Sequence, residues 1–318
     1  MDETPFATYA DAVTGFVAST PLLEEWPGCR QVLLERLSAE PPWTLALPGI
    51  SCVAVGGAPS DAIPVTAAWA TLHQAANILD AVQDGDDITT WGLNTATKAI
   101  SFATGLMFAA FHLLGSVQTY PGAACRIAAL FSEAGFRSSL GQHLSLVEGY
   151  EDVPVAEALE AYWSAVISKS GSIFRAAVAG GAAAGTDSER LIAALGEFGN
   201  CLGVILQVLD DCRDVLAGSD SSDCEVSLPL LLLSMAAQDG RAIGQGQSVD
   251  IPKPGNPLSK EALFGVLDKA GVPDIITDVL LEWQRDALNS LAPLKHSEAV
   301  IALEGIVQHV LATSPSAG

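Results

Sequence analysis

Apolar residues recur three and four positions apart along most of the chain, which is the spacing of one face of an α-helix. Strand-like alternation is scarce, and the single candidate stretch, 43–55, is interrupted by Pro48 and Gly49. The pattern therefore predicts an all-α fold. Long helices are expected over 61–83, 91–117, 122–149, 154–183, 188–217, 258–270, 273–291 and 295–312, and short helices in 6–20 and 28–38.

Helix-breaking residues fall between these runs, and no change in composition marks a second domain. We therefore predict one domain over residues 1–318, with a mobile loop at 239–257, where Gly and Pro are frequent. The predicted breaks are Pro41-Pro42, Gly56-Gly57, Pro121-Gly122, Pro154 and Gly180-Gly181.

Composition excludes several classes of protein. Hydrophobic residues make up 49% of the 318 residues and charged residues 16%, so the chain is not disordered. Its net charge of −22 excludes the basic surface on which binding to nucleic acid or to anionic membranes depends. Residues 99–125 carry no Asp, Glu, Lys or Arg, but His112 and the lack of a flanking basic cluster favour a buried core or dimer helix over a membrane span.

The start of the chain and its cysteines suggest a cytoplasmic protein. The first residues, MDETPFATYADAV, are acidic and resemble no signal peptide. The six cysteines are scattered, form no CxxC pair and have no zinc-ligand spacing, so we interpret them as free thiols in a reducing compartment.

Two acidic clusters follow apolar helical runs. In the first, His73, Asn77, Asp80 and Asp84 share one helical face. In the second, 207–214, the shared face carries Gln207, Asp210, Asp211 and Asp214. Like charges at this spacing repel one another, so a bound cation is expected. Carboxylates facing a diphosphate are typical of Mg²⁺ sites, although an acidic helix end is also often only a solvated surface.

A third segment places Lys169 just before Gly171 within a helical run. Glycine there weakens the helix by about 1 kcal/mol relative to alanine and favours a kink. A lysine beside a diphosphate would supply positive charge to the departing group.

In this order the motifs resemble those of the trans-isoprenyl diphosphate synthase (polyprenyl synthetase) family, of the class I isoprenoid synthase fold, over roughly 60–235. Asp80 and Asp84 match the ends of its first D-D-x-x-D motif, with Ala81 in place of the second Asp. Residues 207–214 match Q-x-x-D-D-x-x-D fully. The weaker matches are Gly141-Gln142 to a G-Q pair, 169–174 to K-T-x-x-L-F, and Ser227-Leu228-Pro229 to T-L-P.

The resemblance implies a helical bundle with a central apolar cavity, usually a homodimer, that ionises an allylic prenyl diphosphate with three Mg²⁺ ions. Asp80 and Asp84 would hold two ions, and Asp210, with Asp211 and Asp214, the third. Substrate contacts would come from Lys169, Gln207, Gln142 and Asn77, with Ala75 and Ala76 as the floor of a deep cavity.

Departures from the family pattern argue against ordinary chain elongation. Chain elongation needs basic residues for the diphosphate of isopentenyl diphosphate, yet 37–97 contain no Lys or Arg. Residues 1–60 also diverge from the family. We therefore order four hypotheses: a terpene synthase, a prenyltransferase to an aromatic or peptide acceptor, a chain elongator with a rebuilt acceptor site, and a non-catalytic subunit of such a synthase.

Overall fold

The structure, a computed structural model, describes residues 4–145, 155–217, 223–224, 258–259 and 272–313. Nearly all of them are helical, which confirms the predicted all-α class. The α-helices are α1 (Thr4–Ala18), α2 (Pro21–Glu24), α3 (Pro27–Ala39), α4 (Pro42–Ala54), α5 (Ile63–Asp84), α6 (Ala96–Leu114), α7 (Ala123–Ser145), α8 (Val155–Val166), α9 (Ser172–Gly185), α10 (Glu189–Ala217), α13 (Val272–Ser290) and α14 (Glu298–Ala312). The shorter elements are the 3₁₀ turns η1 (Pro59–Ala62) and η2 (Thr89–Trp91), the π-helix η4 (Ile167–Gly171), and the antiparallel pair β1 (Asp223–Cys224) and β2 (Leu258–Ser259).

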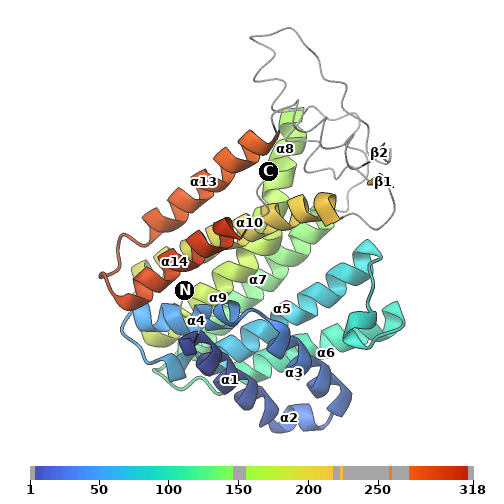
Figure 1. Ribbon diagram of the computed structural model, residues 1–318. Helices are drawn as coiled ribbons and strands as arrows, with labels where there is room; N and C mark the ends of the chain where they lie inside the picture. The colour runs from blue at the N-terminus through green and yellow to red at the C-terminus, as the bar shows by residue number, and fades with distance from the viewer. Residues whose placement is uncertain (1–3, 146–154, 218–222, 225–257, 260–271, 314–318) are drawn as a thin grey trace.

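The long helices pack around one hydrophobic core. Helix α5 packs on α6, while α9 contacts α10, α7 and α4, and α13 covers α10. Figure 1 shows α1 to α3 in blue at the lower edge of the bundle and α13 in orange at the upper edge. The buried apolar side chains form a single cluster that extends from Val13 to Val310. The prediction of one domain over 1–318 stays a prediction, because the expected loop 239–257 lies outside the described residues.

The stretch 43–55, the only candidate strand, lies in helix α4 with Pro48 inside it. Residues on every side of α4, among them Thr44, Leu47 and Ser51, are buried, so its sequence lacks the polar face of a surface helix. Burial, and not strand alternation, explains the continuous apolar run.

Gly180-Gly181 was predicted to break a helix, and that prediction is wrong, because both residues lie inside α9. A Cβ atom at Gly181 would overlap the carbonyl oxygen of Pro48 and the hydroxyl of Ser51. The glycines therefore permit close packing of α9 on α4. The predicted helix 258–270 is also wrong at its start, where Leu258 and Ser259 form β2, and its remainder lies outside the described residues.

Two helices in the described part, over Ala96–Leu114 and Glu189–Arg213, are long and apolar enough to cross a membrane. Length and composition alone are weak support for a span, because a core helix of a soluble protein satisfies the same criteria. The second helix, α10, lies in the core between α9 and α13.

Candidate active site

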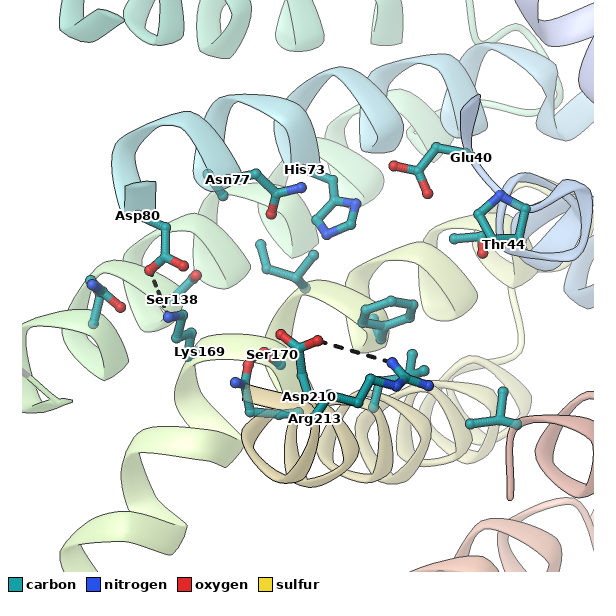
Figure 2. Close-up of a pocket in the computed structure, with 18 of the residues that line it drawn as sticks. Glu40, Thr44, His73, Asn77, Asp80, Ser138, Lys169, Ser170, Asp210 and Arg213 are labelled. Carbon is teal, nitrogen blue, oxygen red and sulfur yellow. Dashed lines mark hydrogen bonds and ion pairs between the residues drawn. The ribbon is translucent and has the colours of Figure 1, made fainter. Parts of the chain in front are cut away.

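A cavity of about 530 Å³ lies between α5 on one side and α9 and α10 on the other. Figure 2 shows its two ends: Asp80 and Lys169 lie at one, Glu40 and Thr44 at the other, and His73 lies between them. The cavity gathers most of the predicted site. Asp80, Asn77, Ala76, Gln142, Lys169, Gln207 and Asp210 all line it.

The first acidic cluster sits on the last two turns of α5. Gly85 ends the helix in the left-handed conformation (φ 79°), directly after Asp84. Asp80 lines the cavity, and the amide of Gln142 donates a hydrogen bond of 2.9 Å to Oδ1 of Asp84. Burial, together with the negative charge of Asp80, raises the pKa of Asp84. The charge of Lys169 and the hydrogen bond from Gln142 oppose this rise and favour the ionised carboxylate.

Lys169 reaches this cluster from the π-helix η4. Its Nζ atom lies 2.6 Å from Oδ1 of Asp80. The expected break at Gly171 takes the form of this wider turn, a conformation frequent at functional sites. A Cβ atom at Gly171 would lie 2.6 Å from Oδ1 of Asn200, so glycine lets η4 pack closely on α10.

The residues of the second acidic cluster, on α10, lie in two different environments. Asp210 faces the cavity, with the Arg213 guanidinium 4.0 Å from its Oδ1 atom. Asp211 instead accepts hydrogen bonds from the Tyr162 hydroxyl (2.7 Å) and the Gln207 amide (2.9 Å). Gln207 in turn accepts a hydrogen bond from the hydroxyl of Ser170. The backbone of Asp214 lies in α10, and its side chain lies outside the described part.

These residues fit Mg²⁺, an ion that prefers oxygen ligands and retains several waters. Apart from Glu40 at the far end, the carboxylates among the described lining residues are Asp80 on α5 and Asp210 on α10. Within the described ranges, no three Asp, Glu, His or Cys side chains lie close enough together to complete a metal site. Asp80, Asp84 and Asp210 would therefore supply part of the coordination, and a diphosphate and water the rest.

The middle of the cavity is aromatic and uncharged. The imidazole of His73 stacks on Trp69 with ring centres 5.2 Å apart and meets the edge of Phe174 at 5.8 Å. Burial lowers the pKa of His73 to about 4, so its side chain is neutral at physiological pH. Ala76 lines the cavity, whereas Ala75 is fully buried in the core.

Sequence reasoning missed the far end of the cavity, which Glu40, Pro41, Trp43 and Thr44 line. Glu40 was not singled out because it precedes Pro41-Pro42 in what looks like an ordinary loop. Tyr162 was missed as well, since no short sequence motif links it to Asp211. The available signal for Glu40 was the absence of Lys and Arg over 37–97, because this range contains the residues that line the far end of the cavity.

A family model described as polyprenyl synthetase matches residues 49–237. The chain belongs to the polyprenyl synthetase family. It is 27% identical over 277 residues to a short chain isoprenyl diphosphate synthase of Methanothermobacter thermautotrophicus, covering 82% of this chain and 83% of the relative. The family resemblance is therefore confirmed.

Solved structures confirm the class I fold. Geranylgeranyl pyrophosphate synthetase of the archaeon Geoglobus acetivorans aligns with a TM-score of 0.76 and 18% identity, covering 96% of this chain and 97% of that one. A polyprenyl synthase of Caulobacter crescentus, complexed with calcium and isoprenyl diphosphate, aligns with a TM-score of 0.72 and 17% identity, covering 98% and 96%.

Proposed function

We propose that the protein is a Mg²⁺-dependent terpene synthase that ionises an allylic prenyl diphosphate and releases diphosphate. The observation that carries this proposal is the polarity of the cavity. Among its described lining residues the Lys and Arg side chains are Lys169 and Arg213, beside Asp80 and Asp210, whereas the opposite wall carries Glu40. One end suits a metal-bound diphosphate, and the other does not suit a second one.

Metal binding would follow the two acidic clusters. Asp80 and Asp84 would hold two of three ions, and Asp210 and Asp214 the third. Bound Mg²⁺ supplies the positive charge that stabilises the diphosphate as its C–O bond breaks. Support comes from the family, whose prenyl diphosphate synthases generally use Mg²⁺, and from the calcium-bound Caulobacter relative.

The chain's own residues would position the leaving group. Lys169 is already in the cavity and would donate hydrogen bonds to the diphosphate oxygens. Gln207 would present its amide from α10, and Gln142 would keep Asp84 aligned through their 2.9 Å bond. Trp43, His73 and Phe174 would exclude water from the allylic cation and face it with aromatic rings.

Three alternatives remain, and each has a supporting observation. Transfer to a neutral acceptor is favoured by Trp43 and Glu40 on the cavity wall. Chain elongation is favoured by the relative from Methanothermobacter, which matches 82% of this chain. A regulatory subunit is favoured by Ala81, which replaces one carboxylate of the first motif.

The deciding experiment incubates purified protein with Mg²⁺ and C10, C15 or C20 allylic diphosphate, each with and without isopentenyl diphosphate. A terpene synthase releases inorganic diphosphate and a hydrocarbon or alcohol from the allylic substrate alone. A longer diphosphate, formed only with isopentenyl diphosphate, would identify an elongator and overturn the proposal. Diphosphate release that persists unchanged in Asp210→Ala would contradict the Mg²⁺-dependent mechanism.

We further propose that the protein is a homodimer, formed through α6 and α7. Phe108 on α6 and Phe136 on α7 are 73% and 74% exposed, a degree unusual for Phe, and Ile100, Phe111 and Leu140 on the same two helices are exposed as well. Phe108→Glu with Phe136→Glu should yield monomers in sedimentation analysis, whereas Leu281→Glu on α13 should not. A wild-type monomer that binds neutral lipid vesicles would instead indicate a membrane surface.

We also propose a reducing, cytoplasmic setting. Cys29, Cys52, Cys125, Cys201 and Cys212 are free thiols, and three of them are buried. Thiols of this kind persist where glutathione keeps them reduced.

A further inference from the structure

Glu40 is held at the far end of the cavity by the ends of two helices. It caps the C-terminus of α3, where its N–H donates to the carbonyl of Arg36 at 3.1 Å, and Pro41 begins the approach to α4. The proline restricts the backbone on both sides of the peptide bond. The direction of the Glu40 side chain is thereby limited before any substrate arrives.

A chain of hydrogen bonds fixes the carboxylate itself. The amide of Gln74 donates to Oε1 of Glu40 at 2.8 Å, and the indole of Trp91 donates to the Gln74 oxygen at 3.3 Å. Gln74 and Trp91 are both buried. Among the described residues no hydrogen bond to Oε2 of Glu40 is found, so one carboxylate oxygen remains available in the cavity.

The surroundings of Glu40 favour proton uptake. The nearby guanidinium of Arg36 lies over the ring of Trp91, 4.7 Å from its centre, where the aromatic face engages it. Burial raises the pKa of Glu40 and outweighs the opposite effects of the Arg36 charge and the Gln74 hydrogen bond, so its carboxylate is a stronger base than an exposed one. Neutral His73 and the apolar Phe174 separate it from Asp80 and Lys169 along the cavity wall.

We propose that Glu40 is the proton acceptor that ends the reaction, with Gln74 as its positioning residue. This inference rests on the proposed function. Cleavage of the C–O bond gives an allylic cation and diphosphate. A C–H bond next to the cation then breaks, its electron pair forms a C=C bond, and the proton passes to Glu40. Glu40 returns the proton to water when the neutral product leaves.

The geometry is compatible with a cation that has moved away from the diphosphate. Gln74, which holds Glu40, precedes Asp80 by six residues, which is about 9 Å along the axis of α5. The same role applies to transfer to a neutral aromatic acceptor, because that reaction also ends with loss of a proton. A negatively charged wall would also disfavour a second diphosphate there.

The test compares Glu40→Gln with Glu35→Gln, an identical change at an exposed position of α3. The glutamine keeps the size of Glu40 and an oxygen for Gln74, but it cannot take up a proton. Diphosphate release and products are measured for each C10, C15 and C20 substrate. In Glu40→Gln we expect the rate of diphosphate release to stay within about threefold of wild type. The elimination product should fall about 100-fold, and an alcohol formed by capture of water should replace it. Glu35→Gln should match the wild type.

The outcomes separate this inference from the proposed function. No diphosphate release by the wild type overturns the proposed function, and this inference with it. Normal wild-type turnover with unchanged products in Glu40→Gln overturns the role of Glu40 alone, as does loss of diphosphate release in a folded Glu40→Gln. If that variant does not fold, Glu40→Ala removes the carboxylate altogether, and products identical to wild type would then overturn the role.

Discussion

The ammonium nitrogen of Lys169 lies 2.6 Å from Oδ1 of Asp80 and joins the π-helix η4 to the last turns of α5. The side chains are only 24% and 33% exposed, so this pair is screened less than a surface ion pair. If Mg²⁺ binds at Asp80 as proposed, it would compete with Lys169 for this carboxylate until a diphosphate arrives. With a diphosphate present, each positive charge would have its own oxygen partners, so metal and substrate should bind cooperatively.

Replacing Lys169 with Gln should separate these two roles. The allylic diphosphate loses a cationic hydrogen-bond donor, so we expect kcat to fall about 100-fold or more. Mg²⁺ binding without substrate should stay the same or tighten, because Asp80 is freed from its ion pair. Calorimetry and a diphosphate-release assay measure the two effects. Lys98→Gln, at the exposed start of α6, is the control and should change neither; full activity in Lys169→Gln would contradict the role.

Replacing Asp84 with Asn should stabilise the metal-free protein. Burial and the charge of Asp80 raise the pKa of Asp84, so the folded state disfavours its ionised form. The wild type therefore loses stability relative to Asp84→Asn as pH rises through this pKa, and the two should be equally stable at a pH well below about 3.9. We expect a gain of about 0.2–0.5 kcal/mol at pH 7, the usual cost of like charges at this spacing.

Urea unfolding of both proteins between about pH 2.5 and 7.5, in EDTA, measures this difference. The asparagine keeps an oxygen that can accept the hydrogen bond from Gln142, so the comparison isolates the charge. Adding Mg²⁺ should favour the wild type. A difference that stays constant over the whole pH range would show that the charge of Asp84 is not its cause.

The helices and both acidic clusters could be predicted from the sequence because they depend on local spacing. Residues three and four apart share a helical face whatever surrounds the helix, so Asp80 and Asp210 were found without knowledge of their partners. The Lys169–Asp80 and Tyr162–Asp211 contacts could not be derived in this way, since each joins two distant helices. Gly180-Gly181 was wrongly predicted to break a helix for the same reason. Gly181 allows close packing against Pro48 of α4, which is a contact between distant parts of the sequence.

Tyr162 should influence the metal through Asp211. Burial, together with the negative charge of Asp211, raises the pKa of Tyr162, so its hydroxyl stays protonated and donates to the carboxylate. Tyr162→Phe should weaken Mg²⁺ binding about 10-fold or more, because outer partners orient carboxylates near metals. A Mg²⁺ titration of activity measures this change. Tyr9→Phe is the control and loses a 2.8 Å hydrogen bond with Thr66. It should lower the free energy of unfolding about as much as Tyr162→Phe does, but it should not change the Mg²⁺ requirement. Equal Mg²⁺ requirements in both variants would rule out the link.

Gly141 should be intolerant of any side chain, although it lies within the regular helix α7. A Cβ atom there would lie 2.5 Å from the backbone nitrogen of Lys169 and 2.7 Å from the carbonyl oxygen of Ala165. Gly141→Ala must therefore push α7 away from η4. We expect it to lower the free energy of unfolding by about 1–3 kcal/mol, as overpacking does, and to displace Lys169 from Asp80.

Gly135, on the same helix, is the matched control, because a Cβ atom there would meet nothing within 4 Å. Gly135→Ala should raise the free energy of unfolding by about 0.4–1 kcal/mol through a less flexible unfolded chain. It should leave diphosphate release unchanged. Thermal unfolding and the release assay on both variants test the pair of expectations. If Gly141→Ala is as stable and active as Gly135→Ala, then close contact between α7 and η4 is not what positions Lys169.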